Sequence, residues 1–390
     1  MNAADTVFIM IATVLVLFMT LPGLALFYGG LVRARNVLSV FMQTMAVAAL
    51  MSVLWLAFGY SIAFGDGGAL NAYWGGFGKA FLLGVTAESL FGSIPEIVFF
   101  GFQMTFAIIT PALIIGAYVE RVGFGFVMAF SGLWMLIVYA PVVHWIWSAG
   151  GWAFQLGTVD LAGGIVVHET AALTALVVAY VLGPRRDKKK PPHNPGYVML
   201  GAAMLWVGWF GFNAGSQLSA SGAAGMTLVV THISAATGAL TWALWERIRY
   251  GKSSLVGLVT GAIAGLAAIT PASGSVGPVE AMIIGAIAGI ITQEMCHVVK
   301  NKLKIDDTLD VFAVHGVGGI FGTLMIAVFG GATWGAQLTA LGVVGAYTVI
   351  MSFILVYVVK LFTPIRVSQE DEYSGLDITA HGERAYDHTS

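Results

Sequence analysis

Long apolar runs alternate with short polar connections along the whole chain. A helix that crosses a bilayer needs about 20 apolar residues, because each residue adds about 1.5 Å along the helix axis. Composition agrees, since 58% of the residues are hydrophobic and only 10% are charged, against about 25% charged in soluble proteins. The runs predict an all-α polytopic membrane protein with eleven transmembrane helices, at residues 6–29, 37–64, 95–119, 124–147, 162–182, 197–217, 225–246, 254–270, 280–299, 311–329 and 337–362.

The basic residues predict the orientation of these helices. With eleven spans, 17 of the 18 Lys and Arg residues fall on one side, and only Lys79 falls on the other. Because Lys and Arg are retained in cytoplasmic loops, the N-terminus is predicted outside and the C-terminus inside. The first apolar run lacks the basic flank of a signal peptide, so either the start is genuine or a leader has already been removed.

A basic, proline-rich stretch at 183–196, which includes Lys188, Lys189 and Lys190, divides the spans five and five. An odd number of spans in each half forces the halves 1–182 and 197–329 to be inverted relative to each other, as in many transporters. The eleventh helix, 337–362, completes a transmembrane domain at 1–363, followed by a cytoplasmic tail at 364–390. Glycines at four-residue spacing, such as Gly257, Gly261 and Gly265, predict close helix packing.

Ionisable residues inside a membrane are costly and therefore serve as functional hypotheses. His168 and His315 occupy matching places in the fifth and tenth spans, each directly after a valine. Two neutral imidazoles lining one pore could pass a small neutral molecule or a proton between them. The alternative is two unrelated core histidines, each bonded to a carbonyl group, which is also the interpretation favoured for His144. Spacing alone does not place the two rings in contact.

The acidic residues in or next to the spans have structural alternatives. Asp160 and Asp310 each precede a span, where an aspartate is either a helix N-cap or part of an ion site. Glu169 follows His168 in the string HETAA, which resembles half of a zinc motif, but Ala172 occupies the place of the second histidine. The sequence therefore indicates no metal site, no cofactor and no enzyme. Glu169 is expected to be protonated or paired with a neighbouring helix.

Aromatic residues gather where the third, fourth and sixth spans approach the outer face. They belong either to the ordinary interfacial belt or to a cation–π site for a small cation. A net charge of −2 gives no attraction to nucleic acid. The residues concerned are Phe102, Phe106, Trp145, Trp147, Trp209, Phe210 and Phe212.

Four segments, in this order and spacing, resemble the hallmark motifs of the ammonium transporters, the Amt/Mep/Rh family, and most closely its bacterial Amt branch. They are GLALFYGGLVRARNVLS (23–39), DLAGGIVVH (160–168), GWFGFNAGS (208–216) and DVFAVHGVGGIFG (310–322). The resemblance covers essentially the whole chain. It implies ammonium uptake across the cytoplasmic (inner) membrane by a homotrimer with one pore in each subunit.

The resemblance also assigns roles to single residues. It implies an outer recruitment site at Trp147, Phe106 and Ser216, supported by Asp160. It implies a gate of two stacked phenylalanines, Phe106 and Phe212, with Phe102 nearby, and a pore lined by the twin histidines His168 and His315. Glu169 departs from the family pattern, which has a neutral residue at this place.

The tail string SGLDITAHGERAYD (374–387) resembles the regulatory tail of the family, which works with the PII nitrogen-signalling protein. A run rich in acidic residues can also be a solvated terminus. The tail residues that match the motif are Gly375, Leu376, Asp377, His381, Gly382, Ala385 and Tyr386.

The cost of placing a bare cation in a low-dielectric pore favours a particular mechanism. The pore residues include no ring of carboxylates of the kind that cation channels use. Ammonium is therefore expected to bind outside, to lose its proton near the gate and to cross as ammonia, with the proton moving separately. The alternatives are a passive gas channel for ammonia or carbon dioxide, and an ammonium sensor. A sensor of this type usually has an added cytoplasmic output domain, and the stretch 364–390 is short for one.

Overall fold

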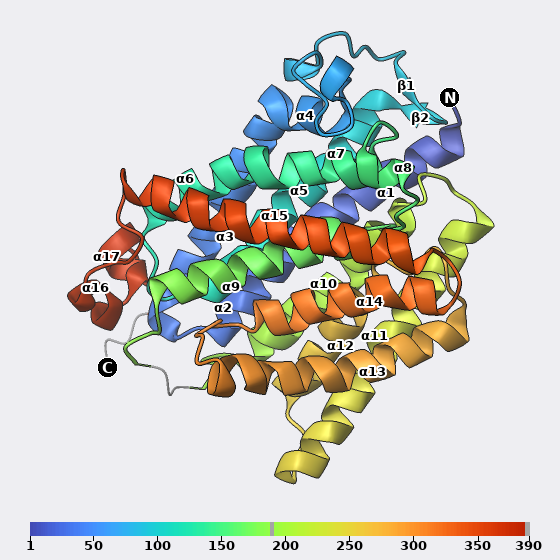
Figure 1. Cartoon of the computed structure of the whole chain (residues 1–390). Coiled ribbons are helices and arrows are strands. Elements are labelled where there is room, and N and C mark those ends of the chain that lie inside the picture. Colours follow the sequence, from blue (N-terminus) through green and yellow to red (C-terminus); the bar gives the residue numbers. More distant parts are fainter. Residues whose placement is uncertain (188–190, 387–390) are drawn as a thin grey trace.

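The computed structural model describes residues 1–187 and 191–386 (Figure 1). Three of the basic linker residues, Lys188, Lys189 and Lys190, and the last residue of the tail motif, Asp387, lie outside the described residues. The chain forms one helical bundle. The N-terminus and the β1–β2 hairpin lie at one end of this bundle, and the short helices α16 and α17 lie at the opposite end.

Helices make up nearly all of the described chain, and its one sheet is the two-stranded β1–β2 hairpin. In the first half they are α1 (Ala3–Phe18), η1 (Met19–Leu24), α2 (Ala25–Leu31), η2 (Ala34–Asn36), α3 (Val37–Leu54), η3 (Trp55–Gly59), α4 (Tyr60–Phe64), η4 (Gly68–Leu70), η5 (Ala80–Leu82), β1 (Leu90–Phe91), β2 (Ile94–Pro95), α5 (Glu96–Tyr118), α6 (Phe124–Trp134), η6 (Met135–Tyr139), α7 (Ala140–Trp147), α8 (Trp152–Gln155), η7 (Gly164–Glu169) and α9 (Thr170–Leu182). In the second half they are α10 (Pro195–Gly215), α11 (Gly222–Tyr250), α12 (Leu255–Ile269), α13 (Pro278–His297), η8 (Val298–Lys302), η9 (Phe312–Gly316), α14 (Val317–Val328), α15 (Trp334–Lys360), α16 (Gln369–Ser374) and α17 (Leu376–His381).

The helices agree with the apolar runs of the sequence. Within the described residues, nine helical segments are long and apolar enough to cross a membrane. Two shorter apolar helices, Leu255–Ile269 and Phe312–Val328, cover the remaining two ranges predicted from the sequence. The membrane-type helical fold is therefore confirmed, while the number of crossings and the orientation stay predictions.

Several long helices contain a π-helical turn, which widens the helix by one residue and changes which face the following side chains occupy. Pro22 lies in the turn η1, where a proline without an N–H removes a helical hydrogen bond. The turns η7 and η9 contain His168 and His315. The two halves of the chain thus place a histidine in the same kind of irregular turn.

The glycines predicted to pack helices closely do so around α11. A Cβ atom at Gly265 of α12 or at Gly285 of α13 would lie 2.2 Å from the same acceptor, the Ser234 carbonyl oxygen of α11. Only residues without a side chain allow backbones to approach this far. The packing role expected for these glycines is confirmed, and α11, α12 and α13 form one compact layer beside the remaining helices.

Candidate functional site

Two close helix crossings bring the predicted histidines together. The His168 and His315 rings are stacked, with centroids 5.2 Å apart and planes inclined by 21°. A Cβ atom at Gly319 would lie 2.7 Å from both the His168 Cβ and the Gly164 carbonyl oxygen, and one at Gly316 would lie 2.8 Å from a methyl group of α9. The two glycines therefore permit η7 and η9 to pack so closely that their histidines meet.

The ring nitrogens of these histidines are largely unpaired. Within the described part of the chain, both ring nitrogens of His168 and the Nδ1 of His315 are buried without a hydrogen-bond partner. By contrast, both ring nitrogens of His144 lie within hydrogen-bond distance of carbonyl oxygens, at 2.9 Å and 2.6 Å, as expected of a core histidine. Unpaired buried polar atoms are rare and costly, so the nitrogens of His168 and His315 are positioned to bind a molecule that enters between them.

A small cavity of about 10 Å³ lies at the paired histidines. Such a volume accommodates roughly one molecule of the size of water. Apart from the two histidines, its wall is apolar or aromatic, and no acidic residue takes part: Met19, Leu24, Phe27, Ile109, Leu113, Val167, Leu205, Trp209, Phe212 and Ile263. The cavity suits a small neutral molecule that can exchange hydrogen bonds with imidazole.

Two phenylalanines close the cavity on one side. The Phe106 ring of α5 and the Phe212 ring of α10 are stacked, with centroids 4.3 Å apart. Phe102 packs edge-on against Phe106 at 5.0 Å, and the Phe212 ring lies 6.3 Å from the His168 ring. The two stacked rings therefore separate the histidines from the residues on the far side of Phe106.

The predicted recruitment residues lie on that far side. The Trp147 ring contacts Phe106 edge-on at 5.7 Å, and its Nε1 donates to the Asp160 carbonyl oxygen at 2.7 Å. Ser216 caps the end of α10, where its hydroxyl donates to the Phe212 carbonyl oxygen at 2.8 Å. Both Trp147 and Ser216 are partly exposed, whereas the two gate rings are buried. An aromatic face and a hydroxyl group thus border the phenylalanine stack.

The Asp160 carboxylate binds the backbone N–H groups at the start of η7, although Gly163 occupies the N-cap position itself. Its Oδ1 accepts from the backbone N–H groups of Gly163 and Gly164, and its Oδ2 accepts from those of Ile165 and Val166, at 2.6–3.1 Å. The capping interpretation is confirmed. Both carboxylate oxygens bind the turn that carries His168, and the backbone carbonyl binds Trp147. Asp160 therefore positions a residue on each side of the phenylalanine stack, while Asp160 itself does not line the cavity.

In the second half of the chain, Asp307 caps the turn that carries the histidine, although Asp310 was the residue expected there. The Asp307 Oδ2 accepts from the N–H of Phe312, the first residue of η9, at 2.7 Å. The expected cap, Asp310, pairs with Lys300 instead, and its backbone φ of +61° is not the extended conformation that an N-cap residue adopts. A repeated spacing in the sequence marks the equivalence: Asp160 and Asp307 each precede a pore histidine by eight residues.

Two further predictions concern residues beside His168. Trp209, assigned above to an outer aromatic group, is instead only 2% exposed and stacks on the His168 ring at 5.6 Å. Its Nε1 donates to the Thr270 hydroxyl at 2.8 Å. Glu169 points toward α15, where a Cβ atom at Gly345 would lie 2.9 Å from its Oε1. The carboxyl thus packs on a neighbouring helix and does not line the cavity. Its Oε2 has no hydrogen-bond partner among the described residues, so the expectation that it is protonated or paired stays a prediction.

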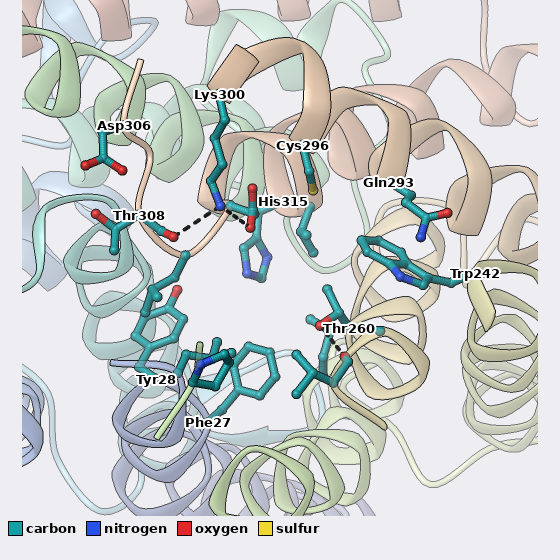
Figure 2. A pocket seen from close by; sticks show the side chains of 18 of the residues that line it. Phe27, Tyr28, Trp242, Thr260, Gln293, Cys296, Lys300, Asp306, Thr308 and His315 are labelled. Atoms are coloured by element: carbon teal, nitrogen blue, oxygen red, sulfur yellow. Dashed lines mark hydrogen bonds and ion pairs between the residues drawn. The ribbon is translucent and has the colours of Figure 1, made fainter. Parts of the chain in front are cut away.

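A larger vestibule of about 600 Å³ opens on the other side of the histidines (Figure 2). His315, Tyr28 and Lys300 contribute to its wall. The Tyr28 hydroxyl donates to the Leu113 carbonyl oxygen at 3.0 Å, which holds the ring at the entrance. The vestibule differs from the small cavity in being lined by charged as well as apolar groups.

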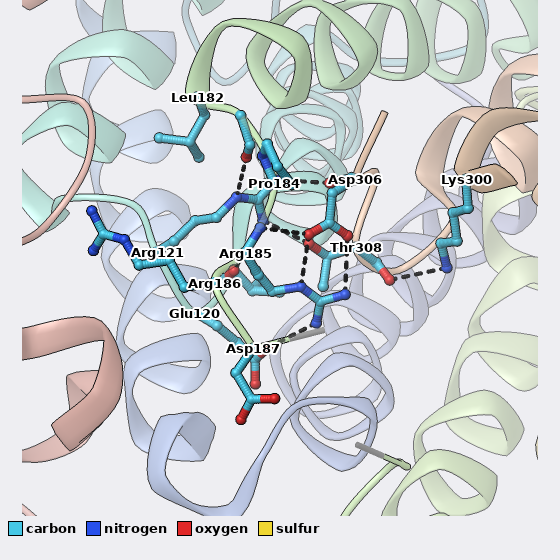
Figure 3. A network of polar contacts seen from close by, with 12 residues as sticks. Glu120, Arg121, Leu182, Pro184, Arg185, Arg186, Asp187, Lys300, Asp306 and Thr308 are labelled. Carbon is cyan, nitrogen blue, oxygen red and sulfur yellow. Dashed lines mark hydrogen bonds and ion pairs between the residues drawn. The ribbon is translucent and has the colours of Figure 1, made fainter. Parts of the chain in front are cut away.

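Charged residues near the vestibule form a dense network (Figure 3). Arg185 binds Asp306 with its Nε and Nη2 and Glu120 with its Nη1, at 2.8–3.0 Å. Burial alone would raise the pKa of the Asp306 carboxyl, but hydrogen bonds and charge attraction from Arg185 outweigh it and hold the pKa below its usual value. The neighbouring Asp307 lacks such a partner, and burial raises the pKa of its carboxyl to about 7, with the Asp310 charge adding to the shift.

The predicted tail motif is docked against the bundle. The Leu376 N–H donates to Asn36 Oδ1 at 2.8 Å, and Asp377 Oδ1 accepts from the Ser39 N–H at 2.7 Å. Upstream of the motif, Glu372 binds Arg366 and Arg186. The rest of the motif is placed as follows: Gly375 against Arg35, His381 edge-on against Phe124, Gly382 at the end of α17, Ala385 packed on the main core, and the Tyr386 hydroxyl 3.1 Å from His193 Nε2. This segment is therefore not a free, solvated terminus.

Comparison with known proteins agrees with this arrangement. The profile of the family described as Ammonium Transporter Family matches residues 7–386. The chain is 43% identical over 405 residues to an "Ammonium transporter" of Bacillus subtilis, with 99% of each chain covered. It is 37% identical to "Ammonium transporter Amt1" of Archaeoglobus fulgidus, covering 99% of this chain and all of that one.

Solved structures show the same fold. A protein titled "Sensor Amt Protein" superposes with a TM-score of 0.91 at 29% identity, over 97% of this chain and 98% of that one. Saccharomyces cerevisiae Mep2 superposes with a TM-score of 0.85 at 34% identity, over 95% of this chain and 88% of that one. These relatives are transporters and not enzymes. With its paired histidines beneath a phenylalanine stack, this chain belongs to the ammonium transporter family.

Proposed function

We propose that the protein takes up ammonium selectively and electrogenically by separating it into ammonia and a proton. Ammonium binds at Trp147, Phe106 and Ser216, loses its proton at the gate and crosses as ammonia past His168 and His315. The observation that carries the proposal is the pair of buried imidazoles with unpaired nitrogens in a small apolar cavity. The proton travels separately, along the histidines and water.

The selectivity follows from the walls of the cavity. A cation without a compensating charge pays a large desolvation cost in such a site, and no acidic residue lines it. Potassium has no proton to lose, so it has no neutral form that can pass. Ammonium has one, and the imidazole nitrogens replace the hydrogen bonds that ammonia loses on leaving water.

We propose eleven membrane crossings in two inverted halves, with the N-terminus outside and the C-terminus in the cytoplasm. The transmembrane domain is 1–363 and the tail is 364–390. The opposite positions of the β1–β2 hairpin and of α16–α17 support this orientation. The cluster of Arg185, Arg121 and Lys300 (Figure 3) supports it as well, because the adjacent Arg186 pairs with Glu372 of the tail. The cytoplasmic (inner) membrane is the proposed location.

We also propose a homotrimer regulated through its tail. Large apolar side chains of α1, among them Val7, Ile11, Val14 and Phe18, recur on one exposed face, which a second subunit or lipid must cover. On the tail side, a cavity of about 730 Å³ lies between the Arg33–Arg35 loop, the linker around His193 and Tyr386. A docked tail beside an open cavity suits a PII-type partner that senses nitrogen status.

The test is a current measurement on purified protein in proteoliposomes. An ammonium concentration jump should give a saturable transient current, and an equal potassium jump should give none. Fast ammonia equilibration without current would support a passive gas channel instead. Ammonium binding without either signal would support a sensor, a second candidate that the structural likeness to the protein titled "Sensor Amt Protein" favours.

A further inference from the structure

One of the ion pairs in the wall of the vestibule, Lys300 with Asp310, lies beside His315 and has no part in the proposed pathway (Figure 2). Lys300, in η8, donates from its Nζ to Asp310 Oδ2 at 2.6 Å and to the Thr308 carbonyl oxygen at 3.2 Å. All three residues lie in the wall of the cavity that also reaches His315. The Lys300 ammonium group therefore lies at the inner end of the pore.

Asp310 has more binding capacity than this ion pair uses. Its Oδ1 is buried and has no hydrogen-bond partner within the described residues. Its backbone φ of +61° is left-handed, a region that aspartate enters more readily than most residues. A buried polar atom without a partner requires an explanation, and a place for a bound ion is one. A purely structural ion pair would not leave this oxygen unpaired.

The groups that hold Lys300 are those that an ammonium ion requires. A lysine side chain ends in an –NH₃⁺ group with three donors and no acceptor, and a free ammonium ion has the same charge and the same kind of donor. Here a carboxylate and a carbonyl oxygen accept from it. We propose that Asp310 and Thr308 form an inner site for a monovalent cation, and that Lys300 occupies this site as a tethered ammonium group when no ion is bound.

The tether makes the site competitive. Two cations about 4 Å apart repel each other strongly in a partly buried site, so a free ion binds Asp310 only when Lys300 withdraws. The side chain of Lys300 is 33% exposed and has a flexible four-carbon stem, so withdrawal into water is open to it. For transport, and only there, the inference rests on the proposed function: Lys300 would keep newly formed ammonium off Asp310 and so favour its release.

The test uses thallium(I), a monovalent cation that is located by its anomalous scattering. Crystals of the wild-type protein, Lys300→Met and Lys304→Met are soaked in the same thallium series. Lys304 is a matched control because it lines the same cavity but makes no ion pair with the described residues. A double variant, Lys300→Met with Asp310→Asn, removes the site itself. Each structure also shows whether the variant has kept the fold.

Lys300→Met should show thallium at Asp310, with half-occupancy at a concentration at least about tenfold lower than in the wild type. Lys304→Met should behave as the wild type, and the double variant should show no peak there. Equal occupancy in the wild type and Lys300→Met, or no peak in a correctly folded Lys300→Met, would overturn the inference. Because the readout is occupancy, a protein that carried no ammonium current would contradict the proposed function without affecting this result.

Discussion

The two halves of the chain carry the same local device and surround it differently. In each half an aspartate eight residues before a histidine caps a π-helical turn, and the two turns meet at the stacked histidines. Asp160 uses both carboxylate oxygens to bind four N–H groups. Asp307 binds η9 through Oδ2 and leaves Oδ1 without a partner among the described residues.

The surroundings of the two histidines also differ between the halves, being apolar around His168 and charged near His315. His168 lies against the aromatic rings of Trp209 and Phe212, whereas His315 reaches a vestibule of about 600 Å³ that carries Lys300 and Asp310. The repeated device explains how the histidines come to face each other. The unequal surroundings give the same pair of histidines an apolar, aromatic side and a charged side.

The largest effect is expected at Asp160. Replacing Asp160 with Ala leaves four buried N–H groups without an acceptor, and we expect a loss of about 3–5 kcal/mol of stability together with the ammonium current. Asp160→Asn keeps one acceptor oxygen, so its stability should lie between those of the wild type and Asp160→Ala. Thermal unfolding in detergent measures the stability. An Asp160→Ala protein as stable as the wild type would show that the cap does not hold η7.

Replacing Asp307 should have the opposite effect to replacing Asp160, because the Asp307 carboxylate destabilises the fold at neutral and higher pH. The folded state retains the Asp307 proton up to about pH 7, while the unfolded chain releases it near the ordinary aspartate pKa of 3.8. The folded state therefore binds more protons between these values, and its stability falls as the pH rises from 4 through 7, by up to about 4 kcal/mol.

Asp307→Asn should remove this fall in stability and leave a protein more stable than the wild type at pH 8. At pH 4 the two proteins should be alike, since both side chains are then neutral. Thermal unfolding across this pH range is the measurement. A parallel pH profile for the two proteins would show that Asp307 is already ionised in the fold at low pH.

The two tryptophans beside the gate should affect different kinetic parameters. Trp147→Leu removes a cation–π partner at the entrance, so the ammonium concentration for half-maximal current should rise about 3–30-fold. Trp209→Leu removes the ring that supports His168, so the maximal current should fall while the half-saturating concentration stays. The measurement is current against ammonium concentration. Identical changes in both variants would remove the distinction between entrance and pore.

Two tail glycines offer a smaller, matched comparison. Gly375 has a φ of +101°, and a Cβ atom there would lie 2.7 Å from Arg35, whereas Gly382 has a φ of +70° and open space around it. Gly382→Ala should cost about 1 kcal/mol of local strain. Gly375→Ala should also displace the tail, seen as several-fold faster proteolysis after Arg366. Equal proteolysis of the two variants would argue against the docked tail.

Much of the fold could be predicted from the sequence, because a helix in lipid must be long and apolar throughout its length. Because these helices are apolar all round, the sequence does not distinguish their buried side from their lipid-facing side. The sequence therefore predicted Trp209 in an outer aromatic group, although it lies against His168. Asp310 directly precedes the helix that carries His315, so its position in the sequence favoured it as the cap. Its left-handed backbone and its ion pair with Lys300 leave that role to Asp307, which no local pattern indicated. The contact between His168 and His315 depends on the helix crossing at Gly319, which no local pattern encodes.

Replacing both histidines is the decisive test of the proposal that nitrogen crosses as ammonia past His168 and His315. Currents from proteoliposomes of the double variant His168→Ala with His315→Ala are compared with those of the wild type after equal jumps of ammonium and potassium. We expect the ammonium current to fall about 100-fold or potassium to begin to pass. An unchanged ammonium current with potassium still rejected would contradict it.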